Sequence, residues 1–367
     1  MTELGPAPFT ITEQDLLGKY EEKLLQVIDE LDGDVEHERI AQVATAMRNL
    51  LYWQAKQYLV PRYDSNNRTI EFAEATDTSG KVRFSSIYNI YAADGVKFVG
   101  AVASRAPNAK ALPDDDESEQ DIEMAKNVDG ALRYLRRQWD VNRLQKELAY
   151  QSWNTGPTYA LTSYVADGHK NGWTEEPVID VEETDIGMGE TVPTPQVKGT
   201  RRFPRGSVEL SLWNVLYVTH PFKAKKLSDC PWLRLEYMEH KALLKSLYPS
   251  LTDEKFDRHD RGGASQLDSL EAQEREASPT SQTPANWSKN KWRYARYWIR
   301  PAYYSLIKGE IGGFEDENGD TETRRICECL EEQYPDGIRV VAVNGKLVEI
   351  IHERLDDVWS VFKTGRG

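Results

Sequence analysis

Two apolar runs that flank Asn344-Gly345 constrain the fold of this chain more than any other feature of its sequence. The runs cover residues 338–343 and 347–351, and the turn-forming residues Tyr334-Pro335-Asp336-Gly337 precede them. Asn-Gly is the preferred pair at the centre of a two-residue hairpin because both positions require positive φ. The sequence therefore predicts a β-hairpin here, and the chain must contain antiparallel β-structure.

Other segments carry apolar residues at the spacing of an α-helix. Asp32-Gly33-Asp34 is expected to separate the first two helices, and Trp139-Asp140 to join the next two as an α-hairpin or a bent helix. Pro231 is expected to open a later helix. The expected helices cover residues 12–31, 40–58, 122–139, 141–148, 231–247 and 324–332.

Alternating or β-branched segments predict strands between and after these helices. Residues 69–105 favour short strands, or a strand and a short helix, and the acidic segment 166–206 favours a hairpin. Further strands are expected over residues 208–218 and 292–299. The predicted fold class is therefore mixed α and β, of the α+β type.

Residues 252–290 interrupt the pattern, because they lack apolar periodicity and are rich in polar residues. Such a composition is typical of a flexible linker. We therefore expect three parts: residues 1–250, a linker over 251–290, and a β-rich part over 291–367.

The charge balance restricts the classes of partner. The formal net charge is -14, whereas proteins that grip phosphate backbones need clustered Lys and Arg. Tight DNA binding by the bulk surface is therefore not expected, although transient contact with DNA is compatible with an acidic surface. Three cysteines give no disulfide framework, and neither a signal peptide nor a membrane span is expected, which indicates a soluble intracellular product.

Catalytic signatures are missing from the sequence. It contains no GxxxxGK[ST], GxSxG or HExxH motif and no GxGxxG after a strand. The run Asp114-Asp115-Asp116-Glu117 resembles a Mg²⁺ site, but consecutive carboxylates also suit the start of a helix, and we favour that interpretation. Cys327 and Cys329 lack the partners of a zinc site, and the histidines are scattered. No catalytic, metal-binding or cofactor-binding residue is predicted, and the chain is not expected to be an enzyme.

One stretch interleaves aromatic and basic residues: Trp287, Lys289, Lys291, Trp292, Arg293, Tyr294, Arg296, Tyr297, Trp298 and Arg300. Trp, Tyr and Arg are the residues that anchor protein–protein interfaces. The same alternation suits a strand with one face in the core, and stacked aromatics with cations also suit single-stranded nucleic acid. All three interpretations remain open from the sequence, with the interface favoured.

The order of several segments resembles the portal proteins of tailed double-stranded DNA phages, particularly those with short tails. The resemblance covers most of the chain and rests on the order of its pieces, each of which is degenerate. These pieces are residues 47–53 (MRNLLYW), 98–102 (FVGAV) leading to Pro107 and Pro113, 151–156 (QSWNTG), 216–218 (LYV) with Pro221, 229–232 (DCPW), 297–301 (YWIRP) and 334–337 (YPDG) before a hairpin.

The resemblance implies a dodecameric ring at one capsid vertex, assembled in the host cytoplasm, with double-stranded DNA passing through its channel without sequence specificity. It also implies docking of the terminase large subunit and later of a head-tail adaptor, and contact with capsid and scaffolding proteins. Residues 1–250 would form most of the wing and 291–367 the clip side, with Trp292, Trp298, Arg300, Pro301, Pro335, Asp336 and Gly337 shaping the clip and its interfaces. Portal chains normally continue past the clip, so we expect the given sequence to be a fragment or a short member.

Two rival functions remain. One is a carboxylate-based, metal-dependent nuclease or hydrolase that uses the Asp114–Asp116 run, and the other is an adaptor or scaffold that forms no ring. Under the portal interpretation, replacing Trp298 with Ala is expected to weaken ring assembly, because large aromatic side chains anchor subunit contacts.

Overall fold

The computed structural model describes residues 13–64, 69–74, 76, 79–81, 89–104, 109–115, 117–166, 171–185, 191–221, 223–224, 226–251, 291–315 and 321–362. The chain divides into two compact units. Unit 1 comprises Met1–Pro107, Asn142–Ala160 and Leu212–Gly367, and unit 2 comprises Asn108–Val141 and Leu161–Ser211. Helices and antiparallel sheets both occur, which confirms the predicted α+β class.

A five-stranded antiparallel sheet organises unit 1, with the order β13-β12-β9-β8-β7. Its strands are β7 (Val218–Thr219), β8 (Trp232–His240), β9 (Lys291–Ile299), β12 (Ile338–Val343) and β13 (Lys346–His352). The prediction of a strand over 292–299 and of a hairpin around Asn344-Gly345 is confirmed, and both turn residues have positive φ, 49° and 82°. Asn344 also fixes the neighbouring strand, since its side chain accepts a hydrogen bond from the Arg293 amide at 3.0 Å.

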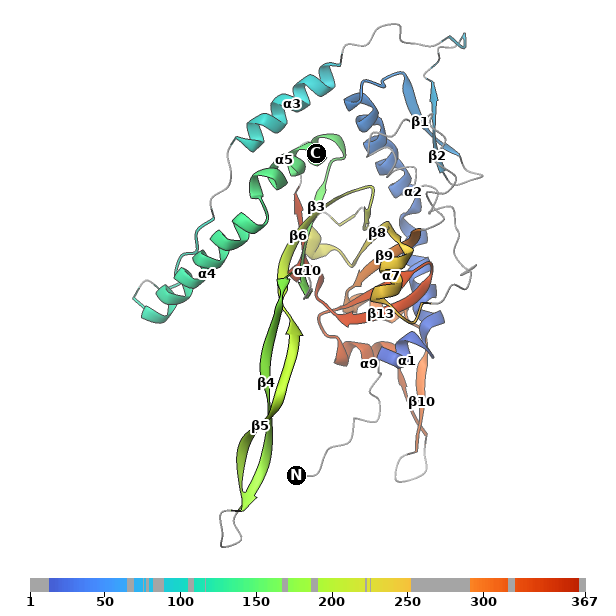
Figure 1. Cartoon of the computed structure of the whole chain (residues 1–367). Helices are drawn as coiled ribbons and strands as arrows, with labels where there is room; N and C mark the ends of the chain where they lie inside the picture. Colours follow the sequence, from blue (N-terminus) through green and yellow to red (C-terminus); the bar gives the residue numbers. More distant parts are fainter. Residues whose placement is uncertain are drawn as a thin grey trace. The chain divides into compact units, whose positions relative to one another are not determined.

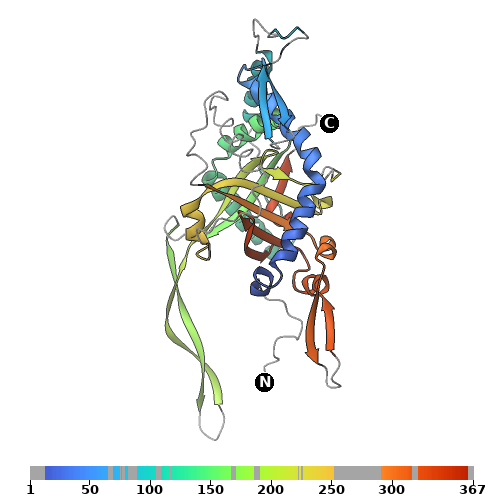
Figure 2. The same ribbon diagram turned by 90° about the vertical axis from the view of Figure 1, so that its right-hand side faces the viewer.

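Helices cover both faces of this sheet (Figures 1 and 2). On one face, α1 (Glu13–Leu17) and α2 (Glu21–Trp53) pack with η3 (Pro301–Leu306) and α9 (Ile326–Gln333) in one apolar cluster. On the other face, α7 (Lys241–Leu247) contributes Leu244 to a second cluster with Tyr294, Val341 and Val343. The β-branched runs of the sheet are therefore buried on both sides.

The helix α2 is continuous over 33 residues, so the expected break at Asp32-Gly33-Asp34 is wrong. A glycine inside a helix costs only about 1 kcal/mol relative to alanine. Burial of Leu31 and Val35 on either side of Gly33 outweighs that cost. Asp32 is also held from outside the helix, by an ion pair to Arg234 on β8.

The helix expected from Pro231 to Leu247 is also wrong in its first half, because residues 232–240 form β8 and only Lys241–Leu247 are helical. Pairing with β9 over the whole of β8 determines the outcome. The two strands are separated in sequence by residues 241–290. Apart from Leu251, the expected linker over 251–290 lies outside the described residues. The strands β9, β12 and β13 therefore belong to the same sheet as β8, and residues 291–362 belong to the same unit.

The remaining elements of unit 1 include two short hairpins and the helix α3. For residues 69–105 the sequence left two possibilities, short strands or a strand and a short helix. The structure has the strand β2 and the helix α3 there. The β10/β11 hairpin was not foreseen. These elements are β1 (Leu59–Asp64), β2 (Thr69–Glu74), α3 (Ile90–Ala103), η1 (Leu227–Asp229), β10 (Glu310–Glu315), β11 (Thr321–Arg325), α10 (Leu355–Val358) and β14 (Trp359–Phe362).

Unit 2 consists of the helix α4 (Glu119–Gln138) and a long hairpin of β4 (Trp173–Asp185) with β5 (Thr191–Pro204). Both were predicted. The helix α5 (Val141–Asn154) follows α4 after a break at Trp139-Asp140, also as predicted, and Asp140 has a φ of 46° there. The strands β3 (Thr158–Ala166) and β6 (Gly206–Asn214) carry the chain between the two units and form a three-stranded sheet, in the order β14-β3-β6.

No helix within the described residues is both long and apolar enough to span a membrane.

The contact between α3 and two tryptophans of unit 1 yields a stability prediction. A Cβ at Gly95 would overlap the Trp53 ring and lie 2.6 Å from Trp153 Nε1, whereas a Cβ at Gly100 in the same helix would meet nothing within 4 Å. We expect Gly95→Ala to lower the free energy of unfolding by about 1–3 kcal/mol through overpacking. Gly100→Ala is expected to raise it by about 0.5–1 kcal/mol. Urea denaturation of both variants tests the contact, and equal effects would contradict it.

Candidate interface site at the end of the central sheet

Most of the residues that the sequence singled out meet at one end of the central sheet. Ile299, the last residue of β9, is paired with Trp232 at the start of β8 and with Ile338 at the start of β12. Ile338 is paired in turn with His352 at the end of β13. Residues 298–301 and 335–337 therefore lie at the same end of neighbouring strands, and we call these seven residues the strand-end site.

Trp298 lies in the core of the strand-end site, with 1% of its surface exposed. Its indole Nε1 donates a hydrogen bond to Glu353 Oε2 at 2.6 Å, and its ring meets Trp359 edge-on at 5.2 Å between centroids. Arg339 Nη1 completes the group with an ion pair to Glu353 at 2.9 Å. The structure therefore places Trp298 as a core residue of unit 1, in keeping with the core-strand interpretation, and not as an exposed interface anchor.

Arg300 ties three segments together. Its Nε donates to the Cys230 carbonyl at 2.7 Å, and its Nη2 donates to the Leu227 carbonyl at 3.3 Å and to Asp356 Oδ1 at 2.7 Å. These bonds fix η1 and α10 against the end of β9. Since the guanidinium is committed to contacts within its own chain, Arg300 shapes the local surface more than it offers a free cation.

The predicted turn Tyr334–Gly337 is present, closed by a hydrogen bond from the Gly337 amide to the Tyr334 carbonyl at 3.2 Å. Gly337 is required there, because its φ is 121° and a Cβ would lie 2.9 Å from the Ile299 carbonyl. Pro335 and Asp336 are exposed at the tip, and Pro301 starts η3. The exposed part of the strand-end site is thus this turn.

Trp292 is the one predicted site residue that lies elsewhere. It is opposite Glu239, at the far end of β9 from Ile299. Its ring is half-buried beneath α7, where Lys241 Nζ and Lys245 Nζ lie 5.0 and 5.8 Å from its centroid. These cation–π contacts join α7 to the sheet.

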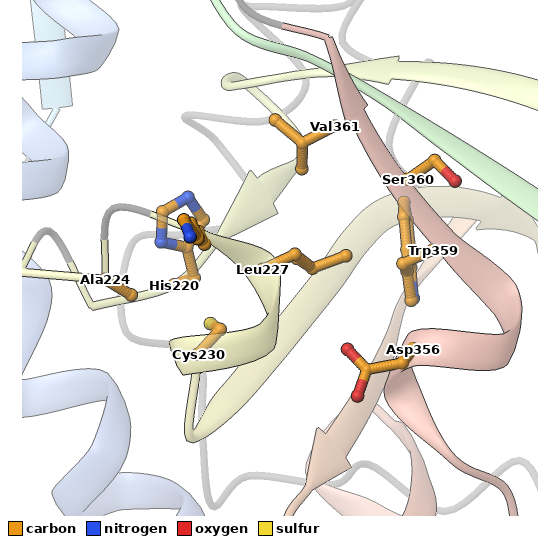
Figure 3. Close-up of a pocket in the computed structure, with 9 residues that line it drawn as sticks. His220, Ala224, Leu227, Cys230, Asp356, Trp359, Ser360 and Val361 are labelled. Carbon is orange, nitrogen blue, oxygen red and sulfur yellow. The ribbon is translucent and has the colours of Figure 1, made fainter.

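A pocket of about 460 Å³ opens beside the strand-end site (Figure 3). Figure 3 shows His220, Leu227 and Cys230 on one side of it, with Asp356 and Trp359 on the other. His220 Nε2 shares a 2.7 Å hydrogen bond with the Tyr159 hydroxyl, and the other ring nitrogen lies 2.9 Å from the Pro221 carbonyl.

In this pocket Cys230 and His220 do not form a nucleophile–base pair. The buried Cys230 thiol donates to the Trp232 carbonyl at 2.9 Å, and both nitrogens of His220 have other partners. Burial raises the pKa of Tyr159 above its ordinary value, and the nearby Cys230 adds to the shift, so its hydroxyl stays protonated. The arrangement suits packing or binding more than acid–base chemistry.

A buried charge cluster lies between α2 and the sheet of unit 1, and sequence reasoning missed it. Asp32 Oδ1 is 2.6 Å from Arg234 Nη1, and Asp32 Oδ2 accepts from the Tyr297 hydroxyl at 3.1 Å. Glu236 pairs with Arg234 at 3.2 Å and also with Arg293. We use the name charge cluster for Asp32, Arg39, Arg234, Glu236, Arg293 and Tyr297.

Burial and pairing shift several pKa values within the charge cluster. Burial alone would raise the pKa of Glu236, but the guanidiniums of Arg234 and Arg293 outweigh it and hold this pKa far below the ordinary range. Burial, with Arg234 nearby, lowers the pKa of Arg39 to about 10. Glu236 and Arg39 are therefore both charged at neutral pH. The one sequence signal was the alternation of Arg234 and Glu236 with Leu233, Leu235 and Tyr237.

The candidate metal residues are not gathered in the structure. Among the residues it describes, no group of three or more His, Cys, Asp or Glu could hold a metal ion. Asp115 accepts a hydrogen bond from the Glu117 amide at 2.9 Å just before α4, while Asp116 is outside the described residues. Cys327 and the buried Cys329 lie on α9, and neither forms a disulfide.

Unit 2 has exposed apolar side chains on α4 and few buried ones among its described residues. No described residue of α4 is buried, and Met124 and Tyr134 are 61% and 67% exposed. Among the described side chains of unit 2, only Leu161 is buried.

Comparison of the sequence with models of known protein families gave no match, and comparison with curated proteins gave no significant match.

Proposed function

We propose that the chain is a structural subunit of a closed ring of the portal type. Such a ring would form the DNA channel at one capsid vertex during genome packaging and ejection. The order of the sequence segments supports this function. The observation that carries it furthest is that unit 2 has almost no core within its described residues.

An isolated two-stranded hairpin is marginally stable in water, and helices gain most of their stability from packing of an apolar face. Among the side chains that the structure describes, the β4/β5 hairpin and α4 bury none fully, and the apolar face of α4 with Ile122, Leu132 and Leu135 is half-buried. Exposed Met124, Val128 and Tyr134 add apolar surface to α4. Elements of this length are explained if neighbouring copies supply the missing contacts, as in a ring.

The charge and the missing motifs are compatible with the same function. A net charge of -14 lets a duplex pass without adhering, because the surface repels phosphates. ATP hydrolysis would belong to the terminase large subunit, which would dock on the ring during packaging. A head-tail adaptor would follow it, and capsid and scaffolding proteins would hold the ring in place.

Light scattering after size exclusion tests the ring and the role of α4. We expect the wild-type chain to elute as a large oligomer. Met124→Glu replaces an apolar contact worth roughly 2 kcal/mol with a carboxylate, and we expect at least a tenfold weaker association. Gln120→Glu adds the same charge at another exposed position of α4 and is expected to leave the mass unchanged.

A monomeric wild-type chain at high concentration would contradict the proposal, and an unchanged mass for Met124→Glu would exclude α4 from the subunit contact. The same samples incubated with duplex DNA and Mg²⁺ address the nuclease alternative. Cleavage that disappears on changing Asp114 and Asp115 would favour that alternative.

A further inference from the structure

We infer that the β4/β5 hairpin of one subunit pairs with the hairpin of the next copy in a staggered register. In this arrangement the outer half of β4, residues 180–185, lies beside residues 197–202 of β5 in the neighbouring copy. The inference rests on the proposed ring and specifies a surface that closes it. Figure 1 shows the long, twisted hairpin, which is a sheet of only these two strands.

Prolines block part of the free edge of β5. Proline has no N–H, so within a strand pair its nitrogen must face away from the partner strand. Pro193 and Pro195 are opposite Glu183 and Val181 on β4, and Pro204 is opposite Trp173. The free edge of β5 therefore lacks donors near the tip and at its end.

The donors that remain on β5 lie between these prolines. A register shift between Val178 and Ile179 leaves one extra residue on β5. The backbone N–H groups that point away from β4 are therefore those of residues 197, 200 and 202. On β4, the same alternation directs the backbone N–H groups of the odd-numbered residues from Ile179 to Asp185 away from β5. Proline is absent from both segments, so each can pair with another strand.

The distribution of charge along the hairpin is uneven. Near its base, Glu175 and Glu176 are opposite Arg202 and Arg201, so the acidic and basic residues are matched across the strands. Toward the tip, four of the six residues 180–185 are acidic, and their register partners are not basic. The partners of Asp180, Glu182, Glu183 and Asp185 are Gln196, Thr194, Pro193 and Thr191.

The basic residues of β5 lie where its donors remain. Residues 197–202 include Lys198, Arg201 and Arg202, and β5 has no basic residue between Thr191 and Val197. An unstaggered neighbour would place the acidic half of β4 beside Pro193 and Pro195. A staggered neighbour places the same acids beside the basic, proline-free segment, and opposite charges across strands are stabilising.

This contact uses different surfaces on the two copies, β4 on one and β5 on the other. Such a heterologous contact repeats from copy to copy, and it forms a closed ring when the rotation between neighbouring copies divides evenly into a full turn. One register that matches these outward N–H groups places Val181 opposite Arg202 of the next copy and Glu182 opposite its Arg201. The second pair provides a direct test.

The test is a disulfide between copies, formed in the full chain that carries Glu182→Cys and Arg201→Cys. Within one chain, Glu182 is opposite Thr194 and Arg201 is opposite Glu176. Residues 182 and 176 are six positions apart along β4, or about 20 Å at the spacing of a strand. That is too far for an intrachain disulfide. We expect mild oxidation to produce a ladder of linked subunits on a non-reducing gel.

Three controls define the outcome. Glu182→Cys with Thr194→Cys is expected to form only an intrachain disulfide, and each single variant is expected to give no ladder. An intact ring of the double variant without a ladder would overturn the staggered pairing and leave the proposed function standing. Dimers formed by Glu182→Cys alone would indicate a two-fold β4 contact and would also overturn it. A monomeric wild-type chain would overturn both proposals.

Discussion

Glu236→Gln is expected to lower the free energy of unfolding by about 3–5 kcal/mol, because it removes one carboxylate from a buried ionic network. Glu236 is 3% exposed and pairs with both Arg234 and Arg293. Without it, these two guanidiniums remain buried and share Asp32 alone among the carboxylates of the charge cluster. Urea denaturation at neutral pH measures the loss.

A matched control lies on the same strand. Glu239 is half-buried at the end of β8, and Glu239→Gln is expected to change stability by no more than about 1 kcal/mol. Equal effects of the two variants would show that the network contributes no more than a surface pair does.

The effect of Glu236→Gln should also depend on pH, with a defined sign. Folding lowers the pKa of Glu236, so its ionised form contributes fully above the unfolded pKa of about 4.3. That contribution is lost as pH falls through the lower pKa of the folded state. The stability difference between wild type and variant is therefore expected to narrow below roughly pH 4. A constant difference down to acid unfolding would contradict the assignment of the low pKa to Glu236.

Trp298→Ala is expected to lower the free energy of unfolding by about 3–5 kcal/mol, the usual cost of removing a large buried aromatic side chain. The change leaves a cavity beside Trp359 and removes the hydrogen bond to Glu353. Trp298→Phe keeps an aromatic ring and loses the hydrogen bond, which contributes about 1 kcal/mol. Trp292→Ala, at the half-buried far end of β9, is expected to cost less than Trp298→Ala.

Two readouts separate a core role for Trp298 from a contact role. If Trp298 is a core residue, Trp298→Ala lowers the stability of the individual chain, and the mass of the ring falls only as the chain unfolds. If Trp298 is an interface anchor, Trp298→Ala reduces the mass of the ring while the individual chain keeps its wild-type unfolding curve. The sequence favoured the second outcome, and the 1% exposure of Trp298 favours the first.

The elements predicted from the sequence are those with strong local signals. Asn344-Gly345 identifies its hairpin because few residue pairs accept two positive φ values in succession. Residues 292–299 alternate clearly, and α4 has amphipathic spacing throughout. The two helix errors have a tertiary cause. Gly33 is tolerated because Leu31 and Val35 on either side of it are buried, and residues 232–240 become a strand because β9 pairs with them.

The candidate site was predictable only in part. The sequence Tyr-Pro-Asp-Gly predicts the turn that Pro335, Asp336 and Gly337 form. The structure places Gly337 beside Arg300. The charge cluster could not be foreseen. Its members Asp32, Glu236 and Arg293 come from α2, β8 and β9, and no local pattern joins residues so far apart in the sequence.

Native mass spectrometry of the full chain is the most direct test of assembly into a ring. We predict a single closed species whose mass is a large integer multiple of the 42.0 kDa chain, with twelve copies expected from the portal resemblance. A monomer, or a series of open oligomers of increasing size, would contradict the ring.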